Sequence, residues 1–263
     1  MKVITDQEHK ALLLDMVIYL AEVCKENNLR FFLEGGTLIG QVRHHGFIPW
    51  DDDFDIAMFR DEYEQLCQIL SNNKPYRIIT HENSKGYSNF FAKLVDTRTK
   101  ITSPDYYDSE DLGVFIDIFP LDKVPISRLQ QFFYFNRIWY LRKISIFTIL
   151  KNVKISNPLF LPWLIFKRLN RIKIIEKANR IAKHYNSSKS TELTNILGSF
   201  KKYVLFPANY YSETIYIEFE KISLPAPVGF DSYLQVIYGD YMQLPPLEER
   251  IGHHDYNLVW RED

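Results

Sequence analysis

An acidic run near residue 50 has the clearest capacity for chemistry in this sequence. It reads Asp51-Asp52-Asp53-Phe54-Asp55. Carboxylates crowded in this way raise one another's pKa unless water or a cation offsets their charge. If residues 54–59 form a strand, Asp53 and Asp55 share one face, about 7 Å apart, while Phe54 and Ile56 point into a core. The apolar surroundings favour a Mg²⁺ site, with Mn²⁺ as the alternative metal, over a solvated acidic turn.

A glycine pair lies upstream of the acidic run, in Gly35-Gly36-Thr37. Glycines allow a phosphate to approach the backbone, and a helix that begins there offers N–H donors to it. We expect a helical turn at residues 38–43. The segment therefore predicts a phosphate contact, and a simple tight turn is the alternative interpretation.

A single carboxylate, Asp117, lies downstream inside the apolar stretch Gly113–Phe119. Burying a charge is costly unless the charge is paired or binds a metal. Asp117 is therefore a candidate third metal ligand. Capping, or pairing with a basic side chain, is the structural alternative.

These residues need secondary structure to bring them together, and the hydrophobic pattern predicts it. Thr5-x-x-Glu8 is a capping box that predicts a helix to about residue 27. A second helix is predicted at 60–70, and a third at 231–238 after a strand and a proline-rich turn. Further strands are predicted at 30–33, 54–59, 76–81, 89–95 and 113–119. This alternation predicts an α+β fold, with a mixed β-sheet flanked by helices.

The composition is that of a folded, globular chain. With 263 residues, 46% of them apolar and 25% charged, it can bury a sizeable core. The two cysteines, Cys24 and Cys67, exclude a disulfide-rich scaffold and are interpreted as small apolar side chains. We find no signal-peptide pattern and no apolar run of about 18 residues. A cytoplasmic location is the expectation.

The formal net charge of −1 conceals a strongly basic segment. Residues 128–183 hold thirteen Lys or Arg against one acid, Glu176, interleaved with aromatic and aliphatic side chains. Pro158 and Pro162 divide the segment into at least two predicted helices. We expect it to contact an anionic membrane surface or an anionic acceptor. A plain helical subdomain is the alternative, and no nucleic-acid partner is expected.

The chemical motifs together resemble the nucleotidyltransferase superfamily. Its pattern is hG[G/S], then Dh[D/E]h, then h[D/E]h, where h is apolar. Here the three parts are residues 33–37, Asp53-Phe54-Asp55-Ile56 and Ile116-Asp117-Ile118. The resemblance implies a nucleotidyltransferase-like palm.

A closer resemblance covers LEGGTLIGQVRHHGFIPWDDDFDIAM, residues 33–58. This stretch is similar to the signature of the LicD family of phosphocholine transferases, which are related to fukutin-like proteins. Residues 93–99, 113–122 and 219–254 also resemble that family, whereas residues 125–190 carry no recognised motif. The resemblance implies Mg²⁺ dependence, a CDP-alcohol donor, most often CDP-choline, and transfer of the alcohol phosphate to a glycan hydroxyl with release of CMP.

The roles of individual residues follow from this chemistry. Asp53, Asp55 and Asp117 are predicted to hold the metal, and Asp117 is the candidate base for the attacking hydroxyl. The predicted donor- or phosphate-binding residues are Gly35, Gly36, Thr37, Arg43, Lys93, His253 and His254. Asp51 and Asp52 are predicted to support the metal ligands. A surface ion pair is the alternative for Arg43 and Lys93, and a structural role is the alternative for the two histidines.

Choline is a quaternary ammonium, which aromatic faces bind. The candidate aromatic walls are Trp50, Tyr87, Tyr106 and Tyr107. Adjacent histidines such as His44-His45 have poor spacing for zinc, so a zinc site is not expected.

The sequence thus predicts a metal-dependent phosphocholine transferase acting on a cell-surface glycan, free or lipid-linked, at the inner face of the membrane. A catalytic core at 1–125 and a C-terminal part at 191–263 would flank a helical insertion at 126–190. Another CDP-alcohol donor (ribitol, glycerol or ethanolamine), a DxD-type glycosyltransferase and an inactive binding module remain alternatives.

Overall fold

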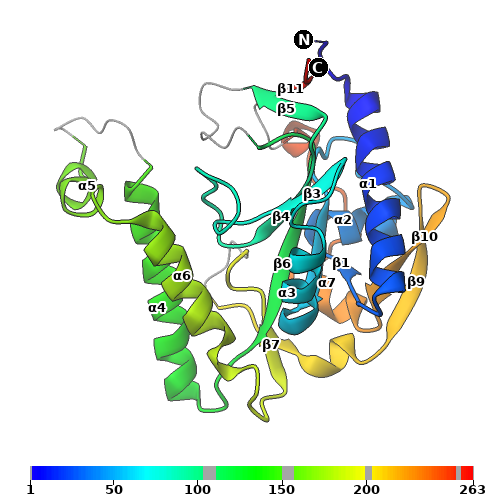
Figure 1. The fold of residues 1–263 in the computed structure, drawn as a ribbon. Coiled ribbons are helices and arrows are strands. Elements are labelled where there is room, and N and C mark those ends of the chain that lie inside the picture. The colour runs from blue at the N-terminus through cyan, green and yellow to red at the C-terminus, as the bar shows by residue number, and fades with distance from the viewer. Residues whose placement is uncertain (1, 103–110, 150–156, 199–202, 253–255, 263) are drawn as a thin grey trace.

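A mixed β-sheet forms the centre of the chain. The computed structural model describes residues 2–102, 111–149, 157–198, 203–252 and 256–262. The strands lie in the order β1 (Phe32–Leu33), β2 (Asp55–Phe59), β6 (Phe115–Lys123), β4 (Ala92–Asp96) and β3 (Tyr76–Ile79). The β2–β6 pair is parallel and the other pairs on this path are antiparallel. β7 (Glu192–Thr194) and β8 (Phe206–Pro207) extend the sheet from β6 (Figure 1).

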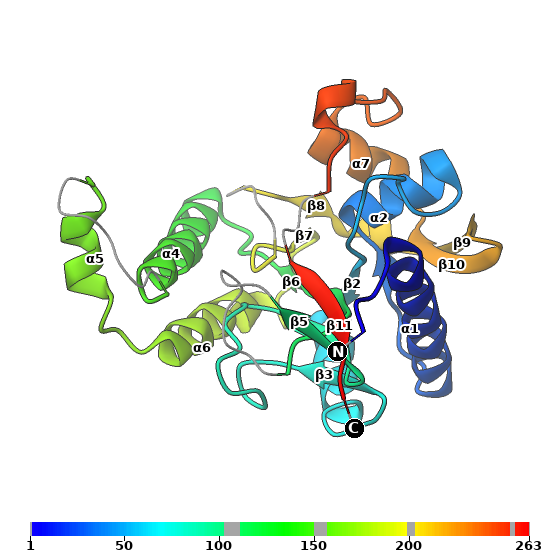
Figure 2. The same cartoon turned by 90° about the horizontal axis from the view of Figure 1, so that it is seen from above.

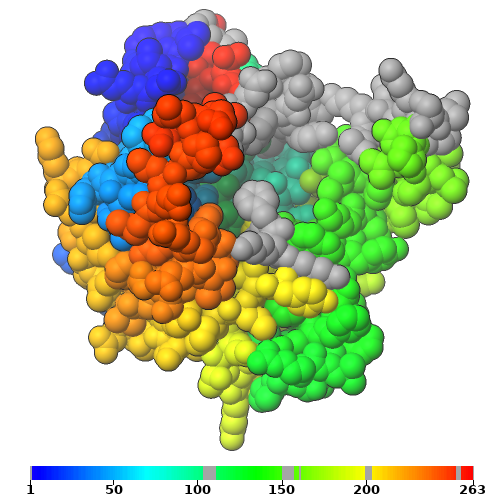
Figure 3. Space-filling model, turned by 180° about the vertical axis from the view of Figure 1, so that it is seen from behind, coloured from blue at the N-terminus to red at the C-terminus, as the bar shows by residue number. Residues whose placement is uncertain are grey.

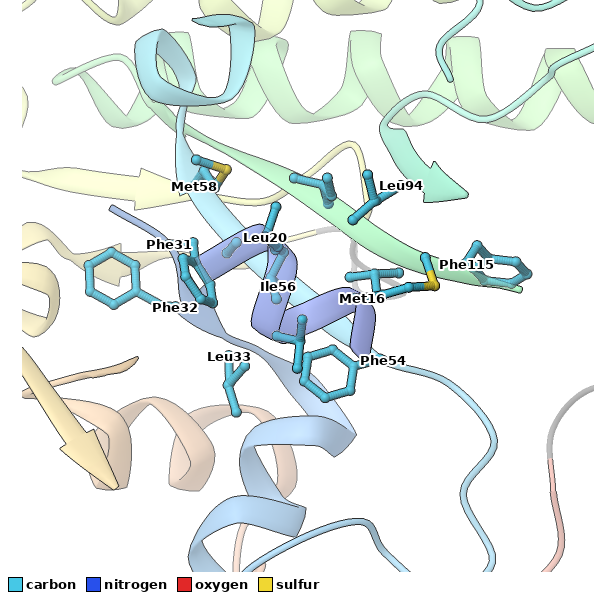
Figure 4. Packing of buried hydrophobic residues seen from close by; sticks show 14 of the residues in the cluster. Met16, Leu20, Phe31, Phe32, Leu33, Phe54, Ile56, Met58, Leu94 and Phe115 are labelled. Carbon is cyan, nitrogen blue, oxygen red and sulfur yellow. The ribbon is translucent and has the colours of Figure 1, made fainter. Parts of the chain in front are cut away.

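One face of the sheet packs against the long helix α1 (Asp6–Glu26). Its Thr5 and Glu8 form the predicted capping box, in which each side chain accepts a hydrogen bond from the backbone N–H of the other. Met16 and Leu20 of α1 meet apolar side chains of β2, including the fully buried Ile56 (Figure 4). Strand alternation sends Ile56 and Met58 to one face of β2 and Asp55 to the other. α3 (Arg60–Ile69) follows β2 directly.

The C-terminal third returns to the core. The strands β9 (Thr214–Phe219) and β10 (Ile222–Pro227) form a hairpin, and α7 (Phe230–Tyr238) follows it. A short pair joins β5 (Thr99–Thr102) to β11 (Asn257–Trp260). The backbone N–H of Ile4 donates to the carbonyl of Leu258 at 2.9 Å, so the described ends of the chain lie together. Short 3-10 turns lie at Lys183–Tyr185, Ala208–Tyr211 and Leu247–Glu249.

A helical segment lies beyond the opposite side of the sheet from α1 (Figures 1 and 2). It contains α4 (Arg128–Phe147), α5 (Phe160–Phe166) and α6 (Arg171–Ala182). α4 and α6 enclose a second hydrophobic cluster that includes Phe135, Ile138 and Ile175. Pro162 lies in the first turn of α5, where a missing N–H costs little, so it does not break that helix. Asn170 caps α6, and its side chain accepts a hydrogen bond from the N–H of Lys173.

The predicted α+β class, with its mixed sheet and flanking helices, is confirmed; the palm and the domain bounds remain predictions. Three local expectations were wrong. Pro225 and Pro227 lie in β10 rather than in a proline-rich turn. Gly35-Gly36-Thr37 does not precede the helical turn but starts it: α2 spans Gly35–Ile39 and continues as a π-helix, η1, at Gly40–His44. The strand after the acidic run begins at Asp55, so Asp53 lies in the preceding loop rather than beside Asp55 on a strand face.

Candidate functional site

Three predicted site residues are brought together by the pairing of β2, β6 and β4. Asp55 pairs with Asp117 in the parallel register, and Asp117 pairs with Lys93 in the antiparallel register. The N–H of Asp117 donates to the carbonyl of Phe54 at 2.9 Å, which fixes the first of these pairs. Residues paired directly across strands project from the same face of a sheet. Two carboxylates and one ammonium group therefore share this face.

Lys93 makes a buried ion pair with Asp117. Its ammonium group donates to Oδ1 of Asp117, and it also lies 3.4 Å from the centroid of the Phe115 ring. The Lys93 residue is only 3% exposed, so this is not a surface ion pair. The contact balances one of the acidic groups on this face, and a role for Lys93 as a phosphate ligand stays a prediction.

The start of α2 is fastened to β2. Gly35 has φ +57°, a conformation that costs other residues strain, and this lets the chain turn from β1 into α2. The Thr37 hydroxyl accepts a hydrogen bond from the N–H of Asp55 at 2.9 Å, and the N–H of Glu34 donates to the carbonyl of Asp55 at 3.1 Å. The sequence predicts that Thr37 binds phosphate. In the structure its hydroxyl positions the backbone of Asp55, a predicted metal ligand.

Glu34 is a buried carboxyl that sequence reasoning did not single out. Its Oε1 accepts hydrogen bonds from Tyr233 Oη at 3.1 Å and from the Asn195 amide, while its buried Oε2 has no hydrogen-bond partner among the described residues. Burial raises the pKa of Glu34 to about 7, and the two hydrogen bonds oppose that shift. The position of Glu34 directly before the glycine pair was the signal that could have identified it. Its burial depends on Tyr233 and Asn195, which lie far away in the sequence.

The loop carboxylates point in two directions. Asp51 and Asp53 line the same cavity as Asp55. The Oδ2 of Asp51 lies 2.7 Å from the position a Cβ on Gly36 would occupy, so a larger residue there would make the Asp51 carboxylate shift. The Oδ2 of Asp52 instead lies 3.2 Å from the equivalent position on Gly252, which is not among the residues lining that cavity.

The cavity has a volume of about 680 Å³ and lies between α2, the acidic loop and the segment after α7. Its walls combine carboxylates with aromatic and basic side chains. The aromatic lining residues are Trp50, Tyr238 and Tyr241. Arg43 is held at the wall, because its guanidinium donates to the carbonyl of Tyr241 at 2.6 Å. Seen from behind the view of Figure 1, the surface is hollowed between the C-terminal segment and α4 (Figure 3).

Electrostatics single out Asp55. Its pKa is raised well above the usual carboxyl range, first by burial and then by the charges of Asp53, Asp117 and Glu34, while Lys93 opposes the shift. Lys93 opposes this shift without cancelling it, so the described carboxylates have the donor atoms and the crowded negative charge that suit a divalent cation. Among the described residues, no three His, Cys, Asp or Glu side chains already stand as a metal-ligand set. The carboxylates therefore fit Mg²⁺ in their chemistry, without a preformed cluster.

The other predicted residues are placed as follows. Tyr87 is buried and its hydroxyl donates to the carbonyl of Phe91 at 2.8 Å, away from the cavity lining. His253, His254, Tyr106 and Tyr107 lie outside the described residues. Arg250, which sequence reasoning did not single out, stacks over Trp50, 5.3 Å from the ring centroid. Desolvation, and after it the charge of Arg250, lowers the pKa of Arg43.

Comparison with known proteins adds to this geometry. Residues 28–151 match the family model described as LicD/FKTN/FKRP, nucleotidyltransferase domain. The whole chain is similar to the lipopolysaccharide cholinephosphotransferase LicD of Haemophilus influenzae, with 32% identity over 97% of each chain. A shorter similarity, 39% identity over 51 residues, joins 19% of this chain to 10% of the human ribitol 5-phosphate transferase FKRP. An uncharacterised protein of Rickettsia prowazekii is 30% identical over 46% of this chain and 42% of its own.

Proposed function

Because the chain belongs to the LicD family of nucleotidyltransferase-domain proteins, we propose that it transfers phosphocholine from CDP-choline to a hydroxyl of a lipopolysaccharide-type glycan and releases CMP. The observation that carries the proposal is the similarity over 97% of both chains to a lipopolysaccharide cholinephosphotransferase. As an enzyme of this family it is a phosphotransferase. The cavity beside Asp55 is the proposed donor site.

The balance of the reaction assigns work to the cavity and to the neighbouring sheet face, where Asp117 and Lys93 pair beside Asp55. The acceptor oxygen bonds to the phosphorus that carries choline, and the bond from that phosphorus to the oxygen of CMP breaks. Asp53, Asp55 and Asp117 would hold Mg²⁺, which when bound offsets the negative charge of the diphosphate and of the departing CMP. Asp117 takes the proton of the attacking hydroxyl, and Lys93 holds that carboxylate in place.

The remaining lining residues suit the rest of the donor. Aromatic faces with carboxylates nearby bind a quaternary ammonium, and Trp50, Tyr238 and Tyr241 supply such faces in the cavity. Arg43 supplies positive charge for a phosphate oxygen. The protein is proposed to act in the cytoplasm.

The deciding experiment measures CMP release from CDP-choline with Mg²⁺ and a lipopolysaccharide acceptor. We expect turnover by the wild type and a loss of at least about a hundredfold in Asp53→Asn. Asp15→Asn, on the exposed side of α1, is the matched control and should retain full activity. Wild-type activity in Asp53→Asn would refute the assignment of the metal site.

The similarity to a ribitol 5-phosphate transferase supports a second candidate donor class, the CDP-alcohols other than CDP-choline. The same assay with CDP-ribitol, CDP-glycerol and CDP-ethanolamine tests it. Turnover of one of these, and none of CDP-choline, would keep the reaction type and change the donor. Donor binding by calorimetry without any turnover would favour an inactive binding module.

A further inference from the structure

The outer face of α4 carries large apolar side chains that the fold leaves in water. The inner face of this helix packs into the second hydrophobic cluster through residues such as Phe135 and Ile138, which are fully buried. Leu129, Phe133 and Tyr140 follow at helical spacing on the other side and are 68%, 56% and 58% exposed. Packing within the chain therefore explains one face of α4 and not the other.

The short helix α5 extends this apolar surface. Leu161 and Ile165 are 67% and 60% exposed. α5 is joined to the C-terminal end of α4 by the ring contact between Phe147 and Phe166, whose centroids lie 5.9 Å apart. Both helices lie at the edge of the molecule farthest from α1 (Figures 1 and 2). We call the exposed residues Leu129, Phe133, Tyr140, Leu161 and Ile165 the outer helical face.

Basic side chains flank the outer helical face. On α4, Arg137 lies one turn after Phe133, and Lys143 lies one turn after Tyr140. Neither makes an ion pair within the part of the chain that the structure describes. The Lys143 ammonium lies 4.9 Å from the Trp139 ring, as it would where a cation and an indole share an interface.

The same pattern recurs on α5. The Lys167 ammonium lies 3.9 Å from the ring of Trp163. Across residues 128–183, Glu176 is the single acid against thirteen Lys or Arg. A purely basic surface would suit soluble anions, and a purely apolar one would suit a protein partner. The combination of exposed aliphatic and aromatic side chains with flanking Lys and Arg matches the interface of an anionic bilayer.

We propose that the outer helical face docks on an anionic lipid bilayer. Its apolar side chains would enter the boundary between headgroups and acyl chains, and Arg137, Lys143 and Lys167 would face lipid phosphates. No described helix combines the length and the apolar character needed to cross a bilayer, so the helices would lie along the surface. The proposal goes beyond the transfer reaction and does not depend on the identity of the donor.

The test is flotation of the whole protein with vesicles of phosphatidylethanolamine and phosphatidylglycerol. In the neutral arm phosphatidylcholine replaces phosphatidylglycerol. We expect binding to the anionic vesicles that weakens as salt is raised. Leu129→Ser with Phe133→Ser should bind at least about tenfold more weakly, because two exposed apolar side chains leave the interface. Arg137→Glu with Lys143→Glu should bind about 25-fold more weakly or worse.

Matched controls change the same chemistry elsewhere on the surface. Val3→Ser with Tyr216→Ser removes exposed apolar groups, and Lys74→Glu with Lys85→Glu reverses exposed charges, all outside residues 128–183. Both control pairs should bind vesicles as the wild type does. CMP release with a soluble glycan acceptor and no membranes, measured on each variant, separates failure of docking from failure of the proposed reaction.

Three results would overturn the proposal. The first is equal binding to neutral and anionic vesicles, and the second is wild-type binding by both outer-face variants. The third is a dimer, seen by analytical ultracentrifugation, that Leu129→Ser with Phe133→Ser dissociates. That result would assign the face to a second copy of the chain.

Discussion

Lys93 and Asp117 face each other across β4 and β6, and their ammonium and carboxylate groups are in contact inside the candidate site. The pair is unusual in position because Asp117 also pairs with Asp55 on its other side. Lys93 thus acts on both Asp117 and Asp55 on this sheet face. The stability of the protein without metal should therefore depend on this lysine.

The first prediction concerns removal of that cation. In Lys93→Met, Asp117 loses its buried ion pair with Lys93, and we expect the free energy of unfolding in chelator to fall by about 3 kcal/mol. Added Mg²⁺ should restore part of the loss, because a cation bound by the same carboxylates replaces the missing charge. Denaturant unfolding with and without Mg²⁺ measures both effects.

Lys123→Met is the control for this variant. Lys123 also lies on the sheet, but its ammonium donates to the carbonyl of Ser188 at 3.0 Å and not to a site carboxylate. Its loss should cost about 1 kcal/mol, with no response to Mg²⁺. Equal Mg²⁺ responses in the two variants would contradict the role given to Lys93.

The second prediction separates two acids on one strand. Asp122 pairs with Arg60 at 2.5 Å deep in the protein, whereas Asp117 lies at the site. Asp122→Asn should lower the free energy of unfolding by about 3 kcal/mol and leave the KM for CDP-choline unchanged. Asp117→Asn should lower kcat by at least about a hundredfold. A wild-type kcat in Asp117→Asn would place the chemistry elsewhere.

The third prediction is a pH dependence of stability. Glu34 has a pKa of about 7 in the folded protein, against 4.5 when it is free. The folded state therefore holds a proton that the unfolded state releases, so this residue makes stability fall as pH rises from about 4.5 to about 7. The full effect is at most about 3 kcal/mol.

Glu34→Gln keeps the shape of the side chain and removes the titration. In chelator, the free energy of unfolding of the variant should not show the decrease with pH that Glu34 causes. The stability of the variant relative to the wild type should therefore rise with pH. Parallel stability curves for the two proteins between pH 4 and pH 8 would contradict the raised pKa.

The fourth prediction concerns Gly35, whose φ of +57° other residues adopt only with strain. A Cβ there would also lie 3.3 Å from Asp55 Oδ2 and 3.4 Å from Tyr238 Oη. Gly35→Ala should lower the free energy of unfolding by about 1–2 kcal/mol and also reduce CMP release, because the added methyl group presses on the site. Gly239→Ala provides the comparison: φ is +71° and the Cβ meets nothing within 4 Å. Gly239→Ala should lower the free energy of unfolding and leave CMP release unchanged.

Much of the local structure could be predicted from the sequence. The capping box, the burial of Phe54 and Ile56 and the helix after β2 follow from neighbouring residues, and all three are confirmed. The family could also be predicted, because its motif lies in one continuous stretch, residues 33–58. Similarity over 97% of both chains to a LicD protein confirms that prediction. The prediction that Asp53 shares a strand face with Asp55 was wrong, because β2 begins at Asp55. Alternation of side chains does not reveal where backbone pairing starts.

The sequence by itself determined which residue types are available for chemistry: the acids, the glycine pair and the basic helical segment. Only the tertiary structure decided which of them meet. Register between β4 and β6 brings Lys93 to Asp117, and packing of distant segments buries Glu34 beside Tyr233 and Asn195. The physical reason is that hydrophobic patterning acts over a few residues, whereas charge compensation and burial depend on contacts between residues far apart in the chain.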